Sequence, residues 1–239
     1  MNFIGNRAKS FGGGVYNHYS KSVFSDVNIN GNLVDLSGGI GGGMCNYYSS
    51  TILSNVAISK NNAKYGGGMY NYYADSVVLN NVSISENMAS GNGGGINNDR
   101  ASAFLNNVTV SGNTANLSGG GICNNETSLH LSNIDINRNT ALNYGGGMYN
   151  ISSPLILTNG NINDNKATYG GGGIYELGAS SFYTNVVISK NTTDYNGGGI
   201  YSGATTSSVY TNVSICSNTA NINGGGMFNY YNASPKIRN

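Results

Sequence analysis

The sequence predicts an all-β fold, a single-stranded parallel β-helix (a solenoid) of about nine coils with roughly 26 residues each. Three observations predict it. A glycine triplet recurs at steps of 25–29 residues, a second phrase recurs between the triplets, and apolar residues alternate with polar ones in that phrase. The triplets start at Gly12, Gly41, Gly66, Gly93, Gly119, Gly145, Gly171, Gly197 and Gly224. We therefore treat residues 1–239 as one solenoid domain.

The second phrase has the period of a β-strand. It reads LNNVSISEN from Leu79 and LNNVTVSGN from Leu105, and its apolar positions are rich in β-branched residues. Each coil should contribute two or three short strands. One repeat cannot bury its apolar face alone, whereas stacked repeats can, and nine coils would give a rod about 43 Å long. A propeller blade would need about 40 residues, and the leucines of a leucine-rich repeat are absent.

Stacking converts each repeat position into a column along the rod, and four columns are apolar. The first is the residue after each triplet, from Val15 to Met227. The others run from Val27 to Val213, from Ile29 to Ile215 and from Phe24 to Tyr210. We expect these columns to fill the interior, where each buried side chain contributes about 1.5–3 kcal/mol.

Asparagine forms three further columns, expected at the corners between strands. The first, expected to be a structural ladder, contains Asn55, Asn81, Asn107, Asn133, Asn159, Asn185 and Asn212. The second runs from Asn6 to Asn218, and the third runs from Asn17 to Asn150 before changing to Glu176 and Ser202. Asparagine tolerates left-handed backbone and bonds neighbouring amides in stacked strands. A polar track that binds a ligand is the alternative interpretation.

The triplets should serve the same corners, because glycine permits positive φ and close approach of two backbones. A phosphate-binding loop is the alternative. That loop would need one triplet opening a helix beside a Lys or Thr, whereas here nine triplets open strands.

Composition excludes several functions. Charged residues make up 9% of the chain and the net charge is +1, so we expect neither nucleic-acid binding nor attraction to an anionic membrane. No apolar run is long enough for a membrane helix, and we expect no membrane insertion by this chain. Cys45, Cys123 and Cys216 cannot form a disulfide framework. No cluster of metal ligands is visible, so no cofactor is expected.

An enzyme remains an alternative, because β-helices also host polysaccharide lyases and glycosidases of the pectate lyase-like fold. Asp99 and Glu126 lie in adjacent coils, but Arg100 stands beside them, and a salt-paired loop is the simpler interpretation. We expect no catalytic residues and favour a protein that is not an enzyme. Ice binding is a third alternative, from a column of small residues, mostly serine and asparagine, that is regular but contains no threonine.

Tyrosine side chains are the candidates for binding a partner. Tyrosine recurs two residues after the triplet, in a column that strand alternation should point outward, and it continues into the next turn. The candidate contact residues are Tyr16, Tyr70, Tyr72, Tyr73, Tyr149, Tyr175 and Tyr201. The partner would be a protein or a glycan, unless loops cover the column. An adjoining apolar column, which includes Phe104, His130 and Phe182, would mark association if exposed, and we interpret His130 there as packed.

The phrase from Ile58 to Met69, I-x-x-N-x-A followed by GGG-M, resembles the F-x-x-N and GGA-[ILV] repeats of polymorphic outer-membrane proteins, and Phe3 to Asn6 matches the first motif. The resemblance covers nearly the whole chain. It implies a right-handed β-helix passenger, as the usual crossover rule also does. It further implies display on a cell surface or outside the cell, as part of a larger protein, for adhesion or structural display.

Neither end of the chain is typical of an amphipathic cap. We expect either a fragment of a longer repeat protein or end-to-end self-association.

Overall fold

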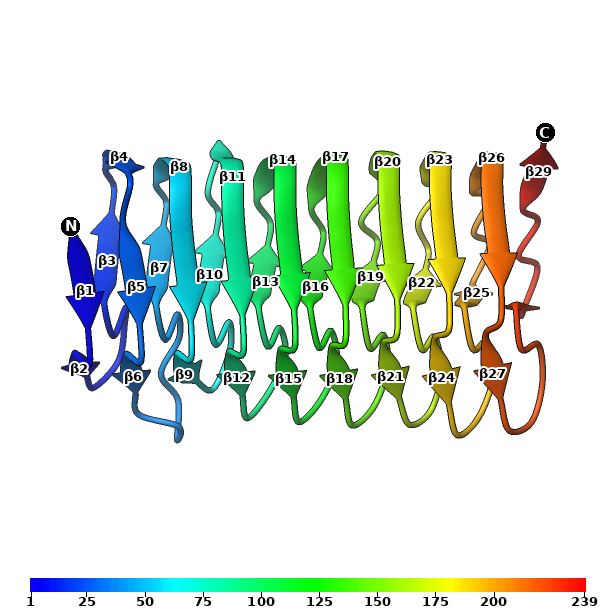
Figure 1. Cartoon of the computed structure of the whole chain (residues 1–239), viewed down its shortest axis with the longest axis horizontal. Coiled ribbons are helices and arrows are strands. Elements are labelled where there is room, and N and C mark those ends of the chain that lie inside the picture. Colours follow the sequence, from blue (N-terminus) through cyan, green and yellow to red (C-terminus); the bar gives the residue numbers. More distant parts are fainter.

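The computed structural model describes all 239 residues as a parallel β-solenoid without helices. The coils follow one another along a single axis, with the two chain termini at opposite ends of the rod (Figure 1). Three parallel sheets run its whole length, and each coil contributes one strand to each sheet in its regular part. The predicted fold class is confirmed. No helix is long and apolar enough to cross a bilayer.

The three sheets differ in strand length. The long sheet contains β1 (Asn2–Ile4), β4 (Lys21–Ser25), β5 (Asn28–Asn30), β8 (Ser50–Ser59), β11 (Val77–Ser85), β14 (Ser102–Ser111), β17 (Ser128–Asn137), β20 (Leu155–Asn163), β23 (Phe182–Ser189), β26 (Val209–Cys216) and β29 (Lys236–Arg238). The middle sheet, which follows the glycine triplets, contains β3 (Val15–His18), β7 (Met44–Tyr47), β10 (Met69–Tyr72), β13 (Ile96–Asp99), β16 (Ile122–Asn125), β19 (Met148–Ile151), β22 (Ile174–Leu177), β25 (Ile200–Gly203) and β28 (Met227–Asn229). The short sheet contains β2 (Arg7–Ala8), β6 (Leu33–Val34), β9 (Asn62–Ala63), β12 (Met88–Ala89), β15 (Thr114–Ala115), β18 (Thr140–Ala141), β21 (Lys166–Ala167), β24 (Thr192–Thr193) and β27 (Thr219–Ala220).

Register follows the repeat without slippage. In the long sheet Val82 lies opposite Val56 on one side and Val108 on the other, and in the middle sheet Ile96 lies between Met69 and Ile122. Identical repeat positions therefore stack directly, as the column argument requires. Since a one-residue slip would turn every apolar side chain outward, the buried columns hold this register.

The four predicted apolar columns form the core, and most of their members are fully buried. Two core columns escaped the sequence analysis. One contains Val77, Ala103, Leu129 and Leu155, at the start of the long strands, and the other contains the alanines from Ala63 to Ala167 in the short sheet. The same column also holds Val34 and Thr193, and both of these larger side chains are buried as well. The first column was missed because it begins just after variable turns.

The buried asparagine ladder, Asn32, Asn61, Asn87, Asn113, Asn139, Asn165 and Asn191, closes the corner between the long and short sheets. Asn113 shows the pattern. Its Nδ2 donates to Asn139 Oδ1 at 2.9 Å and to the Ile84 carbonyl at 3.0 Å. Its Oδ1 accepts from the backbone N–H and the Nδ2 of Asn87. The side chain thus satisfies buried backbone groups that the turn leaves unpaired, and it links three coils.

A second buried ladder follows the middle sheet and breaks at Glu176. Asn98, Asn124 and Asn150 bond in series, but Asn150 Nδ2 has no partner, since the carboxylate of Glu176 in the next position is directed to other groups. The fully buried Glu176 carboxylate accepts from the hydroxyls of Ser181, Tyr183 and Ser208. Burial raises the pKa of Glu176 above its ordinary value, although these hydrogen bonds oppose the shift.

The predicted ladder from Asn55 to Asn212 lies on the surface, where it bends each long strand. Asn107 has φ 53°, as the corner prediction requires, and its Nδ2 donates to Asn81 Oδ1 at 2.7 Å. The ladder is confirmed, but its side chains bond one another rather than interior backbone, and at one step Asn133 donates to Asn106 instead of Asn107. The buried ladder fills that interior role, and sequence alone did not separate the two columns because both are asparagine at the same period.

The glycine triplets are required by contact with the next coil. Gly119 has φ 69°, and a Cβ on Gly121 would lie 2.6 Å from the carbonyl oxygen of Gly147. A side chain there would separate the coils, so the predicted roles of positive φ and close approach are both confirmed. End-to-end association stays a prediction.

The two ladders should differ in energy. Asn113→Ala removes partners from the buried Ile84 carbonyl and Asn87 N–H, so it should lower the free energy of unfolding by about 2–4 kcal/mol. Asn107→Ala loses one exposed bond and a favoured left-handed residue, for about 1 kcal/mol. Urea denaturation of both variants measures this, and equal losses would contradict the assignment.

The buried carboxyl should make stability depend on pH. A pKa raised by folding means that Glu176 stabilises the fold below its unfolded pKa, near 4.5, and that this contribution is lost as the pH rises through the folded pKa. Glu176→Gln keeps the shape without the charge. It should unfold at higher urea than the wild type at pH 8, with the difference shrinking toward pH 4.5. A constant difference across this range would show that Glu176 does not titrate as described.

Candidate functional site

The outward side of the middle sheet and its flanking turns form an aromatic face. Its main column comprises Tyr16, Cys45, Tyr70, Asn97, Cys123, Tyr149, Tyr175, Tyr201 and Phe228, the second residue after each triplet. Strand alternation directs these side chains away from the core, because the residues before and after them point inward. The structure therefore places all but two of the predicted contact tyrosines in this column, and Tyr72 and Tyr73 lie beside it.

Toward the N-terminus the aromatic face is built from stacked rows. Tyr19, Tyr48 and Tyr73 occupy the turn after the middle strands, and their ring centroids are 5.1 Å apart at each step, with nearly parallel planes. Tyr47 and Tyr72 stack beside them at 4.8 Å. These spacings match the coil repeat of about 4.8 Å, so the stacking follows from the register of the backbone.

Toward the C-terminus the main column continues as a second stack. Tyr149 and Tyr175 lie 5.4 Å apart, Tyr175 and Tyr201 lie 4.5 Å apart, and Phe228 follows at 5.2 Å. Tyr144, from the loop before a triplet, packs against Tyr175 at 4.6 Å. The loop thus covers part of the column.

Exposure along the column is uneven. Tyr16 is 41% exposed, whereas Tyr70 and Tyr175 are 8% and 7% exposed, and the remaining tyrosines are half-buried. The question that the sequence left open therefore has a mixed answer, since loops cover some rings and leave others accessible. Burial raises the pKa of Tyr149 to about 12, so its hydroxyl stays protonated and can donate.

A polar gap interrupts the aromatic face between the two stacks. Its outward residues are Asn92, Asn97 and Asp99 in one coil and Ser118, Cys123 and Asn125 in the next. Tyr65 and Tyr70 border it on one side, and Tyr149 and Ile151 border it on the other, around a groove of about 450 Å³. Sequence reasoning missed this gap because it followed the residues that recur, whereas the gap consists of the residues that depart.

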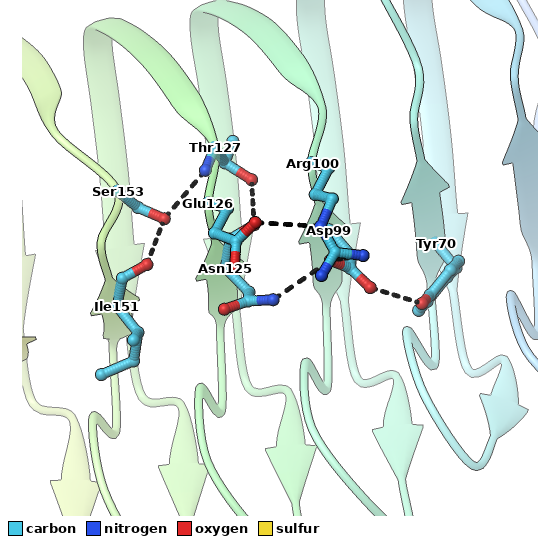
Figure 2. A network of polar contacts seen from close by, with 8 residues as sticks. All are labelled: Tyr70, Asp99, Arg100, Asn125, Glu126, Thr127, Ile151 and Ser153. Carbon is cyan, nitrogen blue, oxygen red and sulfur yellow. Dashed lines mark hydrogen bonds and ion pairs between the residues drawn. The ribbon is translucent and has the colours of Figure 1, made fainter.

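Hydrogen bonds organise one side of the gap (Figure 2). Asp99 accepts from Asn125 Nδ2 at 3.1 Å and from the Tyr70 hydroxyl at 3.5 Å. Arg100 donates to Glu126 at 2.9 Å and lies over the Tyr73 ring at 5.4 Å. Asp99 and Glu126 are therefore joined through a salt-paired turn, the simpler of the two interpretations that the sequence allowed.

The apolar row beside the interior column lies on the outside of the long sheet. Its exposed members include Ile52, Phe104, Ile156 and Phe182. His130 is also exposed and stacks on Phe104 at 5.0 Å, so the expectation of a packed histidine there is wrong. The physical reason is that Leu131, the next residue, takes the inward position. This row is the second candidate surface for association.

Comparison with known families gave one match. A model of the Chlamydia polymorphic membrane protein repeat matches residues 185–203, which include one I-x-x-N phrase and one glycine triplet. Comparison with curated proteins and with solved structures found no match. The repeat match and the solenoid together support a β-helix similar to the polymorphic membrane proteins, and they suggest a surface-associated protein.

The cysteines should differ in reactivity. Cys45 and Cys123 are buried, and burial raises the pKa of each thiol to about 12, whereas Cys216 is exposed. Since the thiolate is the reactive form, an aromatic disulfide reagent at pH 8 should label one thiol per chain quickly and three in denaturant. Cys216→Ser should abolish the fast phase. Rapid labelling of more than one thiol in the native chain would contradict the burial of Cys45 and Cys123.

Proposed function

We propose that this chain is a non-catalytic recognition module, displayed at a cell surface, that uses its aromatic face for adhesion to a protein or a glycan. The observation that carries the proposal is the alignment of tyrosines in stacked rows over successive coils. Tyrosine supplies large contact area at a low entropic cost and a hydroxyl that can hydrogen-bond at the rim. The repeat match supports display at the surface.

The rigidity of the scaffold supports the same proposal. Each row is fixed by parallel strands whose register does not vary, so little ordering is needed when a partner binds. The accessible rings over the first coils include Tyr16, Tyr19 and Tyr48. Tyr19 stacks on Tyr48, and His18 lies between Tyr16 and Tyr19. A patch of this kind resembles the aromatic centres of protein interfaces rather than an ordinary solvated face.

The test is binding of beads coated with the chain to cultured cells. Tyr19→Ser with Tyr48→Ser should weaken binding at least tenfold, because loss of each central aromatic contact typically costs more than about 1 kcal/mol. Thermal unfolding should confirm that the variant still folds.

The matched control is Phe104→Ser with Phe182→Ser, which removes two exposed aromatic rings from the long sheet. This variant should bind as the wild type does. Loss of binding in the control alone would assign adhesion to the apolar row and contradict the proposal for the aromatic face.

A further inference from the structure

The polar gap is a coordinated change in three neighbouring columns. The three columns are the residue before the triplet, the outward residue of the main column and the residue two positions after it. In the coil on the N-terminal side of the gap they hold Tyr65, Tyr70 and Tyr72. In the next coil these three positions hold Asn92, Asn97 and Asp99. In the coil after it they hold Ser118, Cys123 and Asn125. The coil after that restores Tyr144, Tyr149 and Ile151. Six positions lose their large side chains together, while the backbone register continues unchanged.

We propose that this gap is a binding subsite for a neutral saccharide, an inference that rests on the proposed recognition role of the aromatic face. The groove of about 450 Å³ falls within the range of small-molecule sites. Tyr70 and Tyr149 are three coil steps apart, or about 14 Å. One ring thickness of about 3.5 Å leaves some 11 Å between the walls. That space accepts one or two sugar rings.

The floor of the gap has unused hydrogen-bonding capacity. The Asn97 side chain lines the groove and forms no hydrogen bond within the protein. Asn92 uses its Oδ1 to accept from the Ser118 N–H, which leaves its Nδ2 free. Asp99 is held in place by Asn125 and Tyr70 and retains further lone pairs. Fixed donors and acceptors side by side suit the neighbouring hydroxyls of a sugar, because each hydroxyl can both donate and accept.

The walls suit the other surface of a sugar. A pyranose ring has a face of C–H groups and a rim of hydroxyls. Tyr70 and Tyr149 offer apolar ring area to the C–H face of the sugar and hydroxyls to its rim. An aromatic side chain from a protein partner would match the walls equally well. An aromatic side chain would, however, leave the Asn92 and Asn97 amides desolvated without hydrogen-bond partners, which is unfavourable.

The charges of the gap specify a neutral ligand. Asp99 is the one charged residue that lines the groove, and it is acidic. The nearest cation, Arg100, already pairs with Glu126 at 2.9 Å and with Asp99 at 4.0 Å, and it lies over the Tyr73 ring. A sialylated or sulfated sugar would bring a second negative charge to Asp99, and Arg100 would have to leave these partners to balance it.

The experiment probes the folded chain on an array of neutral oligosaccharides printed beside sialylated and sulfated ones. We expect binding to neutral glycans. Cys123→Tyr fills the gap with the residue found at Tyr149, Tyr175 and Tyr201 of the same column, so the fold should tolerate it, and binding should fall at least tenfold. Asn97→Ala should weaken binding to a similar extent. The matched control Cys216→Tyr makes the same substitution at the exposed cysteine that ends β26 of the long sheet, outside the gap and the aromatic face, and should have no effect.

Several outcomes would overturn the subsite. These are no neutral glycan bound, preference for charged glycans, or full binding by Cys123→Tyr. Cell adhesion separates this inference from the proposed function. In one case the double variant of Tyr19 and Tyr48 loses cell binding, whereas Cys123→Tyr keeps both its cell binding and its glycan binding. The saccharide subsite is then wrong and the adhesive face stands. If no variant alters cell binding but Cys123→Tyr loses the neutral glycans, the subsite stands and the adhesive role is wrong.

Discussion

The hydrogen bonds of the buried asparagine ladder are the constraint on which the rest of the structure depends. Each asparagine satisfies backbone groups that a tight corner would leave unpaired inside the rod, and it repeats the contact in the next coil at about 2.9–3.0 Å. A buried polar group without a hydrogen-bond partner costs about 1–3 kcal/mol, so water would enter a corner that lacked this side chain. The glycine triplets complete the corner, because Gly121 lies too close to Gly147 for any side chain.

A fixed corner gives a fixed spacing, and the spacing organises the surface. Because equivalent residues stack at one coil step, a tyrosine repeated in the sequence becomes a row of parallel rings, as Tyr48 and Tyr73 show. The same rule lets the surface change without disturbing the core. Asn97 and Cys123 replace tyrosine on the outside while Ile96 and Ile122 stay buried beneath them. The polar gap therefore requires no special backbone, only different side chains on a regular scaffold.

Sequence predicted the parts of the structure that repeat. The coil number, the four apolar columns and the asparagine corners follow from a period that local physics can interpret. The sequence could not distinguish the buried Asn113 from the exposed Asn107. The way in which three strands close around the core decides which asparagine column faces inward. Nor did the sequence reveal the gap. Asn97 and Asp99 are unremarkable in sequence, and they form a site only because Tyr70 and Tyr149 stand on either side in the folded rod.

Hydrogen exchange of the asparagine side-chain amides, followed residue by residue by NMR, tests the central claim most directly. The account predicts that the Nδ2 protons of the buried ladder, from Asn61 to Asn191, exchange at least about 100-fold more slowly than those of the exposed ladder from Asn55 to Asn212. The slow protons should be released only when the coils themselves open. Equal, rapid exchange in both ladders would contradict the claim that buried amide bonds fix the coil spacing.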